Sequence, residues 1–102
     1  MASKKSSVLL SPAQMAEVAA LFKVLGEPMR LRILQAVCKH PRSVNEIVEA
    51  TGSTQANVSK HLALLAAAGI LRREKEGQRV FYSVREPLVV RLCELVREKW
   101  LA

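Results

Sequence analysis

The sequence predicts one mainly α-helical domain with a small β-hairpin, in the order α-α-α-α-β-β-α. Three observations carry this prediction. Two short amphipathic segments between residues 43 and 65 are separated by a glycine-containing turn. A strand-turn-strand pattern rich in basic residues follows between residues 70 and 85. An apolar stripe at helical spacing then runs through residues 88–100.

The first two helices are predicted from their end signals. Ser11-Pro12 starts the first helix, because serine caps a helix and proline suits its first position. Gly26 is expected to end it, and Glu27-Pro28 to start the second helix. Arg30 and Arg32 lie among the apolar residues of the second helix, and we expect them to reach solvent or phosphates.

The third and fourth helices form a predicted helix-turn-helix over residues 43–65. Gly52 ends the third helix, because glycine readily takes the left-handed conformation found at helix ends. Thr54 is a suitable N-cap for the fourth helix. Val58, Leu62 and Leu65 fall at i, i+4 and i+7, which predicts one buried stripe on the fourth helix.

The opposite side of the fourth helix carries short hydrogen-bonding groups. Such groups can pair with base edges or hold phosphates, so we expect this helix to enter a major groove of double-stranded DNA. The candidate DNA-binding residues of the turn and helix are Ser53, Thr54, Gln55, Asn57, Ser59, Lys60 and His61. The simpler alternative is a polar side that only faces water.

A basic hairpin is predicted next, with strands at residues 70–75 and 78–84 and a turn at Glu76-Gly77. Val80, Tyr82 and Val84 alternate with other side chains, so one face should be half buried. A basic ribbon beside a recognition helix is the layout of a winged helix-turn-helix, in which the wing contacts phosphates or a minor groove. The candidate wing contacts are Arg72, Arg73, Lys75 and Arg79. A hairpin that is merely solvated is the alternative.

The composition fits a polyanionic partner. The net charge is +7 and the isoelectric point about 10.0, which favours nucleic acid first and an acidic membrane surface second. A charge that only maintains solubility is the alternative.

We expect a flexible tail over residues 1–9 and a single domain over residues 10–102. No secretory pattern or membrane-spanning run is visible, so we expect a cytoplasmic protein.

A second subunit is expected, because a small domain with few aromatic side chains has a thin core. The last helix starts at Glu86-Pro87 and carries a long apolar stripe. We expect it to pack on the first helix and on its copy in a homodimer. The predicted interface residues are Val18, Phe22, Leu88, Leu92, Val96 and Trp100. The alternative is a last helix folded fully onto its own domain.

Three motifs resemble a known family. Leu25–Val37, Ser53–Leu71 and Glu76–Val84 are similar, in this order, to the second-helix signature, the recognition helix and the wing of the ArsR/SmtB family of small dimeric winged-helix repressors. The resemblance covers about residues 12–100. It implies a homodimer built on the first and last helices, and binding to an imperfect palindrome near a promoter. It also implies release of DNA when a ligand or oxidant is sensed.

The two common metal sites of that family are absent from this sequence. One uses a Cys-x-Cys pair, and the matching positions are Ser43 and Asn45, which offer no thiolate to a soft metal. The other uses Asp-x-His and His-x-x-Glu on the last helix. Its matching positions are Glu86, Leu88, Lys99 and Ala102. One carboxylate is not a zinc site, so we predict no metal site.

Cys38 and Cys93 remain as candidate sensing residues. The resemblance implies a possible redox role, since some relatives use a thiol pair that links the second and last helices. Inert packing is the alternative, because both cysteines lie among apolar residues. Two cysteines are too few for a disulfide scaffold.

No catalytic constellation or cofactor motif is present, and a Ser-His-Asp triad is impossible because the chain contains no aspartate. The predicted function is a sequence-specific, dimeric DNA-binding repressor that is not an enzyme and needs no cofactor. A winged-helix protein-interaction module and a repressor that senses nothing are the alternatives. The sequence does not identify the operator or the inducer.

Overall fold

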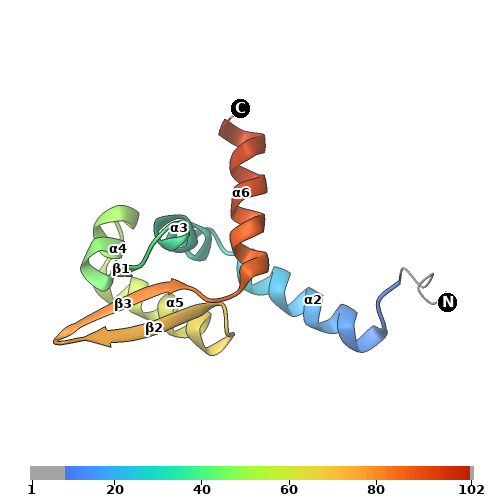
Figure 1. Ribbon diagram of the computed structural model, residues 1–102, viewed down its shortest axis with the longest axis horizontal. Coiled ribbons are helices and arrows are strands. Elements are labelled where there is room, and N and C mark those ends of the chain that lie inside the picture. Colours follow the sequence, from blue (N-terminus) through green and yellow to red (C-terminus); the bar gives the residue numbers. More distant parts are fainter. Residues whose placement is uncertain (1–8, 102) are drawn as a thin grey trace.

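The computed structural model describes residues 9–101 (Figure 1). The predicted tail over residues 1–9 therefore lies, apart from Leu9, outside the described residues. The elements follow the predicted order, with one additional short strand. They are α2 (Pro12–Leu25), α3 (Pro28–Val37), β1 (Arg42–Ser43), α4 (Val44–Thr51), α5 (Gln55–Ala67), β2 (Leu71–Glu76), β3 (Arg79–Val84) and α6 (Pro87–Leu101).

Capping residues set the helix starts. Ser11 Oγ accepts a hydrogen bond from Gln14 N at 3.1 Å, while Gln14 Oε1 accepts from Ser11 N at 2.9 Å, which closes a capping box at α2. Ser43 and Glu46 form the same arrangement at α4, with distances of 3.2 and 2.8 Å. Each cap of this kind contributes about 1 kcal/mol to the stability of its helix.

The helix-turn-helix, formed by α4, the turn and α5, follows the predicted turn chemistry. Gly52 ends α4 with a φ of 69°, in the left-handed region that favours glycine. Thr54 is extended and its hydroxyl accepts a hydrogen bond from Asn57 N at 3.1 Å, which caps α5. Both predictions are confirmed. Each of these positions requires a particular backbone conformation, and the local sequence is enough to predict it.

The core lies where α3, α4 and α5 meet the sheet. Ile33, Ile47 and Leu65 have no exposed surface, and Val58 is equally buried. Burying each such side chain contributes about 1.5–3 kcal/mol. The predicted stripe of α5 is therefore the side that packs inward. From α6, Val89 joins this core with 1% of its surface exposed.

The sheet has three antiparallel strands in the order β1-β3-β2. β2 and β3 form the wing, and their register places Arg73 opposite Tyr82 and Lys75 opposite Val80. The sequence did not predict β1, since two residues give no alternation to detect. β1 pairs with β3 through Arg42 and Ser43, which fixes the start of α4 against the wing.

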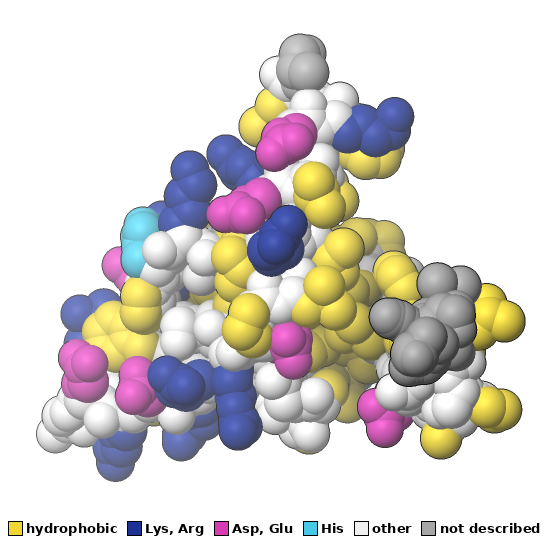
Figure 2. Space-filling model, turned by 45° about the vertical axis from the view of Figure 1, so that its right-hand side comes forward, with side chains coloured by type: hydrophobic (Ala, Val, Ile, Leu, Met, Phe, Trp, Pro, Cys, Tyr) yellow, Lys and Arg dark blue, Asp and Glu magenta, His cyan; other side chains and the backbone are white. Residues whose placement is uncertain are grey.

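Two helices project away from this body. α2 and α6 diverge from each other, and hydrophobic side chains gather where they separate (Figures 1 and 2). Within one chain α6 contacts mainly β3 and packs on the core through Val89, and it makes at most weak contacts with α2. Phe22, Val96 and Trp100 consequently remain 59%, 53% and 70% exposed.

Within residues 9–101, the structure contains no helix whose length and hydropathy would let it cross a membrane.

Candidate nucleic-acid interface

One face of α5 is free of contacts with the core. Gln55, Ser59 and Lys60 are exposed on it, as predicted. Ala56 and Ala63 are exposed on the same face and were not predicted. Their spacing from Ser59 and Lys60 places them there, and alanine can contact a thymine methyl group while letting a helix approach bases closely.

The turn before α5 is held by its own side chains. Asn57 Nδ2 donates a hydrogen bond to Ser53 Oγ at 2.9 Å, and Thr54 caps the helix. Asn57 and Ser53 are half-buried, whereas Thr54 is exposed. These residues therefore fix the angle at which α5 leaves the turn, and this role is compatible with the predicted contacts to DNA.

His61 does not lie on the exposed face, and its predicted position there is wrong. Its side chain is buried, with 6% of its surface exposed. The helical period explains this, because position 61 follows Val58 by three residues and precedes Leu65 by four, on the buried stripe. His61 Nδ1 accepts a hydrogen bond from Arg30 Nε at 3.3 Å.

Arg30 and Arg32 are both engaged within the protein. Arg30 is half-buried, and one guanidinium nitrogen donates to the Val24 carbonyl at 3.0 Å. Arg30 is therefore only partly exposed, and most of its guanidinium is engaged inside the protein. Arg32 reaches the surface as expected, but its guanidinium also donates to the Thr51 carbonyl. Both arginines thus fasten α3 to neighbouring elements.

Glu27 reinforces this arrangement at the start of α3. Its Oε1 accepts a hydrogen bond from Arg30 N at 3.1 Å. Desolvation raises the pKa of Glu27, but hydrogen bonds from the Arg30 and Met29 amides, together with the nearby His61 and Arg30 side chains, outweigh it. The net pKa lies below its usual value, so Glu27 caps α3 as a carboxylate.

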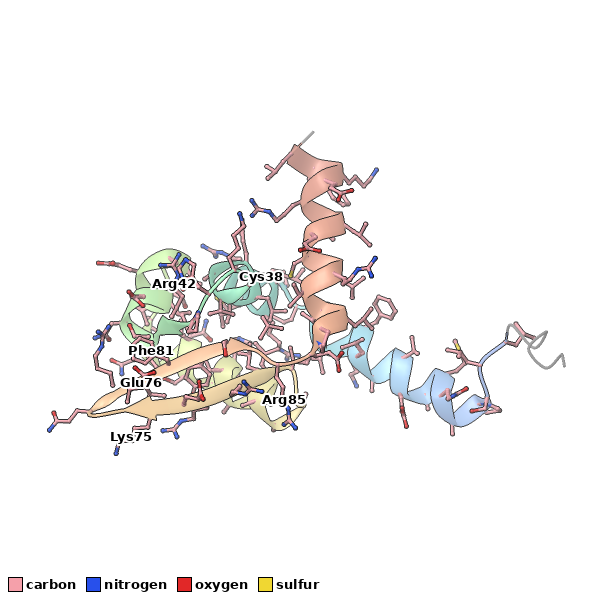
Figure 3. The ribbon with its side chains drawn as sticks, in the orientation of Figure 1. Cys38, Arg42, Lys75, Glu76, Phe81 and Arg85 are labelled. Carbon is pink, nitrogen blue, oxygen red and sulfur yellow. The ribbon has the colours of Figure 1, made fainter. Side chains whose placement is uncertain are left out.

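The wing carries basic side chains on both faces. Arg73 and Lys75 share a face with Tyr82 and Val80, while Arg72 lies on the other face. All the predicted wing residues are exposed, and the Lys75 side chain points outward from the hairpin (Figure 3). This leaves cations free to contact a phosphate chain from more than one side of the ribbon.

Arg79 lies on the second face of the wing, where its guanidinium stacks over the Phe81 ring at 4.9 Å from the centroid. A cation held against an aromatic ring has a restricted geometry, which lowers the entropy lost when it binds a phosphate.

The two cysteines are brought together by the fold. Cys38 caps the end of α3 next to α6 (Figure 3), and Cys93 lies on α6. Both are half-buried, and the two thiols are within hydrogen-bonding reach. Desolvation, the hydrogen bond with Cys38 and the charge that Cys38 carries when ionised raise the pKa of Cys93 to about 12, so Cys93 stays protonated.

Among the described residues, no group of three or more His, Cys, Asp or Glu side chains gathers as a metal site would.

Comparison with known proteins matches this arrangement to one family. Residues 27–73, which hold α3, the helix-turn-helix and the start of the wing, match the family described as "Bacterial regulatory protein, arsR family". The solution structure of the homodimeric winged helix-turn-helix DNA-binding domain of Mb0332 from Mycobacterium bovis is 31% identical, with a TM-score of 0.76. The similarity covers 96% of this chain and 88% of that one. The chain belongs to the ArsR family.

Two further relatives agree with this assignment. HlyU from Vibrio cholerae N16961 is 28% identical with a TM-score of 0.85, covering 90% of this chain and all of that one. A Streptomyces lividans protein named "Probable mercury resistance operon repressor" is 37% identical over 79 residues. That match covers 78% of this chain but only 63% of the repressor.

This ArsR-family chain is accordingly a winged helix-turn-helix transcriptional regulator and not an enzyme.

Proposed function

We propose that the protein is a dimeric repressor that binds an operator in double-stranded DNA, in the cytoplasm, with α5 in the major groove and the wing on the adjacent backbone. The observation that carries this proposal is the exposed face of α5. Gln55, Ser59 and Lys60 face outward there, on a helix whose other side is fixed in the core. Adjacent wing cations supply the electrostatic contacts that such binding requires.

The exposed apolar side chains of α2 and α6 support a homodimer. Phe22 of α2 and Val96 and Trp100 of α6 expose more than half of their surface, which a stable monomer rarely tolerates in one region. The homodimeric Mb0332 domain shares this fold. We propose that α2 and α6 meet their copies in a second subunit and bury the interface residues predicted from the sequence, namely Val18, Phe22, Leu88, Leu92, Val96 and Trp100. Two recognition helices would then face half-sites about one helical turn apart.

Fluorescence anisotropy tests the proposal directly. The probe is a labelled duplex from the region upstream of the protein's own gene, and the control is a shuffled duplex of equal composition. We expect binding at least about 1,000-fold tighter to the upstream duplex at physiological salt, with two chains per site. Equal and weak binding to both duplexes would contradict operator recognition and favour the protein-interaction module.

The thiol pair supports a second proposal, on the signal. We propose that hydrogen peroxide joins Cys38 to Cys93. The raised pKa of Cys93 leaves Cys38 as the attacking thiol. Its sulfur attacks the peroxide as a thiolate, the O–O bond breaks, and the released hydroxide takes the proton that the Cys38 thiol gave up. The Cys93 sulfur then attacks the resulting sulfenic acid and water leaves. Overall, two thiols and one peroxide give a disulfide and two waters.

Such a disulfide would tie the end of α3 to α6, and so couple the DNA-binding core to the proposed dimer helix. We expect peroxide to weaken binding to the upstream duplex by about tenfold or more, reversibly with dithiothreitol. Cys38→Ser and Cys93→Ser should both abolish this response while binding normally when reduced. A response that persists in either variant would contradict the thiol-pair proposal, and no response in the wild type would assign the cysteines to packing.

A further inference from the structure

The side chain of Asn57 is used differently from those at the matching positions of α2 and α4. Gln14 and Glu46 are each the third residue of their helix, and each accepts a hydrogen bond from the backbone amide of its own N-cap. Asn57 is the third residue of α5, but its Nδ2 donates to the Ser53 hydroxyl at 2.9 Å, one residue before the N-cap Thr54. The Asn57 side chain therefore ties α5 to the turn and not to its own cap.

The turn that receives this hydrogen bond is itself fixed to the rest of the fold. Arg32 of α3 donates to the carbonyl of Thr51, the last residue of α4, and Thr51 has only 2% of its surface exposed. The Gly52 amide donates at 2.9 Å to the carbonyl four residues earlier, which closes the end of α4. Ser53 follows directly, so the Ser53–Asn57 hydrogen bond joins a fixed turn to the first turn of α5.

This hydrogen bond limits what Asn57 can offer to DNA. Asparagine recognises adenine when its carboxamide oxygen and nitrogen face the base edge together. Asn57 is half-buried, and its nitrogen is directed back to the turn. Gln55 and Ser59 on the same helix are exposed. The carboxamide of Asn57 is thus engaged inside the helix-turn-helix, whereas its neighbours on α5 face outward.

We propose that Ser53 and Asn57 form a positioning pair that holds the start of α5 in its DNA-binding orientation, and that Asn57 does not read a base. The proposal rests on the proposed DNA-binding function and deepens it. It separates the residues that orient the recognition helix from those that contact bases.

The expected effect on binding follows from the population of the binding orientation. When only a fraction of the molecules has the binding orientation, the apparent affinity falls by that fraction, whichever duplex is bound. Loss of the Ser53–Asn57 hydrogen bond should therefore weaken all duplexes by the same factor. We expect a factor of about five, the scale of one net hydrogen bond. Loss of a base-reading side chain would instead remove the preference at one position of each half-site.

The test is a double-mutant cycle with Ser53→Ala, Asn57→Ala and the variant that combines them. Fluorescence anisotropy with excess reductant gives their affinities for the upstream duplex and for its single base-pair substitutions. Each single variant should bind about fivefold more weakly, and the combined variant no more weakly than either, because both changes remove the same hydrogen bond. Independent contributions would multiply to about 25-fold. Ser53→Thr keeps a hydroxyl acceptor and should recover most of the affinity that Ser53→Ala loses.

Gln55→Ala is the matched control for the cycle, because Gln55 is exposed on the same turn of α5. Its effect should multiply with that of Asn57→Ala. Alanine at position 57 keeps the backbone amide that donates to Thr54 and is favoured in helices, so α5 should remain capped and folded. Circular dichroism of each variant checks the fold at the temperature of the binding measurement.

NMR of the free protein tests the hydrogen bond without DNA. A side-chain amide proton of Asn57 should exchange with solvent more slowly in the wild type than in Ser53→Ala. Equal exchange rates would overturn the positioning pair whether or not DNA binds.

The binding results separate the two proposals. If the wild type does not distinguish the upstream duplex from the shuffled one, the proposed function itself is overturned. If the wild type does distinguish them, three results would overturn the positioning pair alone. These are multiplied effects of Ser53→Ala and Asn57→Ala, wild-type affinity in both single variants, and loss of preference at one base pair in Asn57→Ala.

Discussion

At the scale of single residues, polar side chains take different roles according to their place in the helical period. Lys60 and His61 are neighbours in sequence, yet Lys60 is exposed on the proposed DNA face while His61 is buried against Arg30. Their difference is one step of about 100° around the helix. Whether a polar residue next to a buried stripe lies in the core or at the surface is therefore decided by its angle around the helix and not by its chemistry.

Glu46 offers a test of pH dependence at this scale. The Ser43 amide hydrogen bond is the largest effect, and with the Ser43 hydroxyl, Arg42 and Arg79 it outweighs desolvation and lowers the pKa of Glu46 below 4.5. A lowered folded pKa stabilises the fold above the unfolded pKa, and this contribution disappears as the pH falls through the folded value. The free energy of unfolding of Glu46→Gln should therefore lie below that of the wild type near pH 7 and converge with it in acid.

Urea denaturation between about pH 7 and pH 2.5 measures this difference. Glu49→Gln is the control, because Glu49 is exposed on the same helix but outside the capping box. A constant gap between Glu46→Gln and the wild type over this range would show that the charge of Glu46 does not contribute.

At the scale of elements, the sequence predicted every helix and strand of residues 9–101 except β1, because end signals and apolar periods are local. The end of α4 at Gly52, the start of α5 at Thr54 and the position of the wing turn could be predicted to within a residue or two. β1 was missed, since its two residues become a strand only by pairing with β3. The internal hydrogen bonds of Arg30 could not be predicted, because its acceptors on α2 and α5 are brought together only by the packed structure.

The turn of the helix-turn-helix should be sensitive at Gly52. Its φ of 69° suits glycine, and a Cβ there would meet nothing within 4 Å, so the cost of Gly52→Ala is purely conformational. We expect a loss of about 1–2 kcal/mol in the free energy of unfolding. Gly52→Asn should lose less, because asparagine tolerates the left-handed region. Thermal unfolding of both variants would check the order, and an alanine variant as stable as the wild type would contradict it.

The wing and the recognition helix should contribute separately to electrostatic binding. Lys60→Ala and Arg79→Ala should each reduce the slope of log affinity against log salt by about 0.9, if each contacts one phosphate. Lys99→Ala, at the far end of α6, should leave the slope unchanged. Anisotropy from about 50 to 200 mM salt measures the slopes. An unchanged slope in both variants would place the DNA elsewhere on the surface.

At the scale of the whole molecule, one chain is an incomplete unit. The core is closed around α3, α4 and α5, whereas α2 and α6 diverge with apolar side chains exposed (Figures 1 and 2). The sequence predicted an apolar stripe on α6, but a stripe shows that a surface is buried without showing by which chain. A second subunit explains why the stripe exists without a partner in its own chain.

Charges placed in this region should separate the subunits. Phe22→Glu combined with Trp100→Glu should shift the protein from dimer to monomer and weaken binding to the upstream duplex by at least about tenfold, through loss of the second half-site. Ala50→Glu, on the exposed side of α4, is the control and should stay dimeric. Sedimentation equilibrium gives the masses. A dimer that persists with both charges would place the interface on another surface.

The central claim is that the exposed face of α5 reads bases, and Gln55→Ala tests it most directly. The measurement is the affinity of the wild type and the variant for the upstream duplex and for a set of single base-pair substitutions across each half-site. We predict that the variant loses about 1–3 kcal/mol on the natural site and no longer distinguishes the bases at one position per half-site. If the variant instead weakens every duplex equally and keeps the wild-type preference at all positions, Gln55 does not read a base and the proposed docking of α5 is wrong.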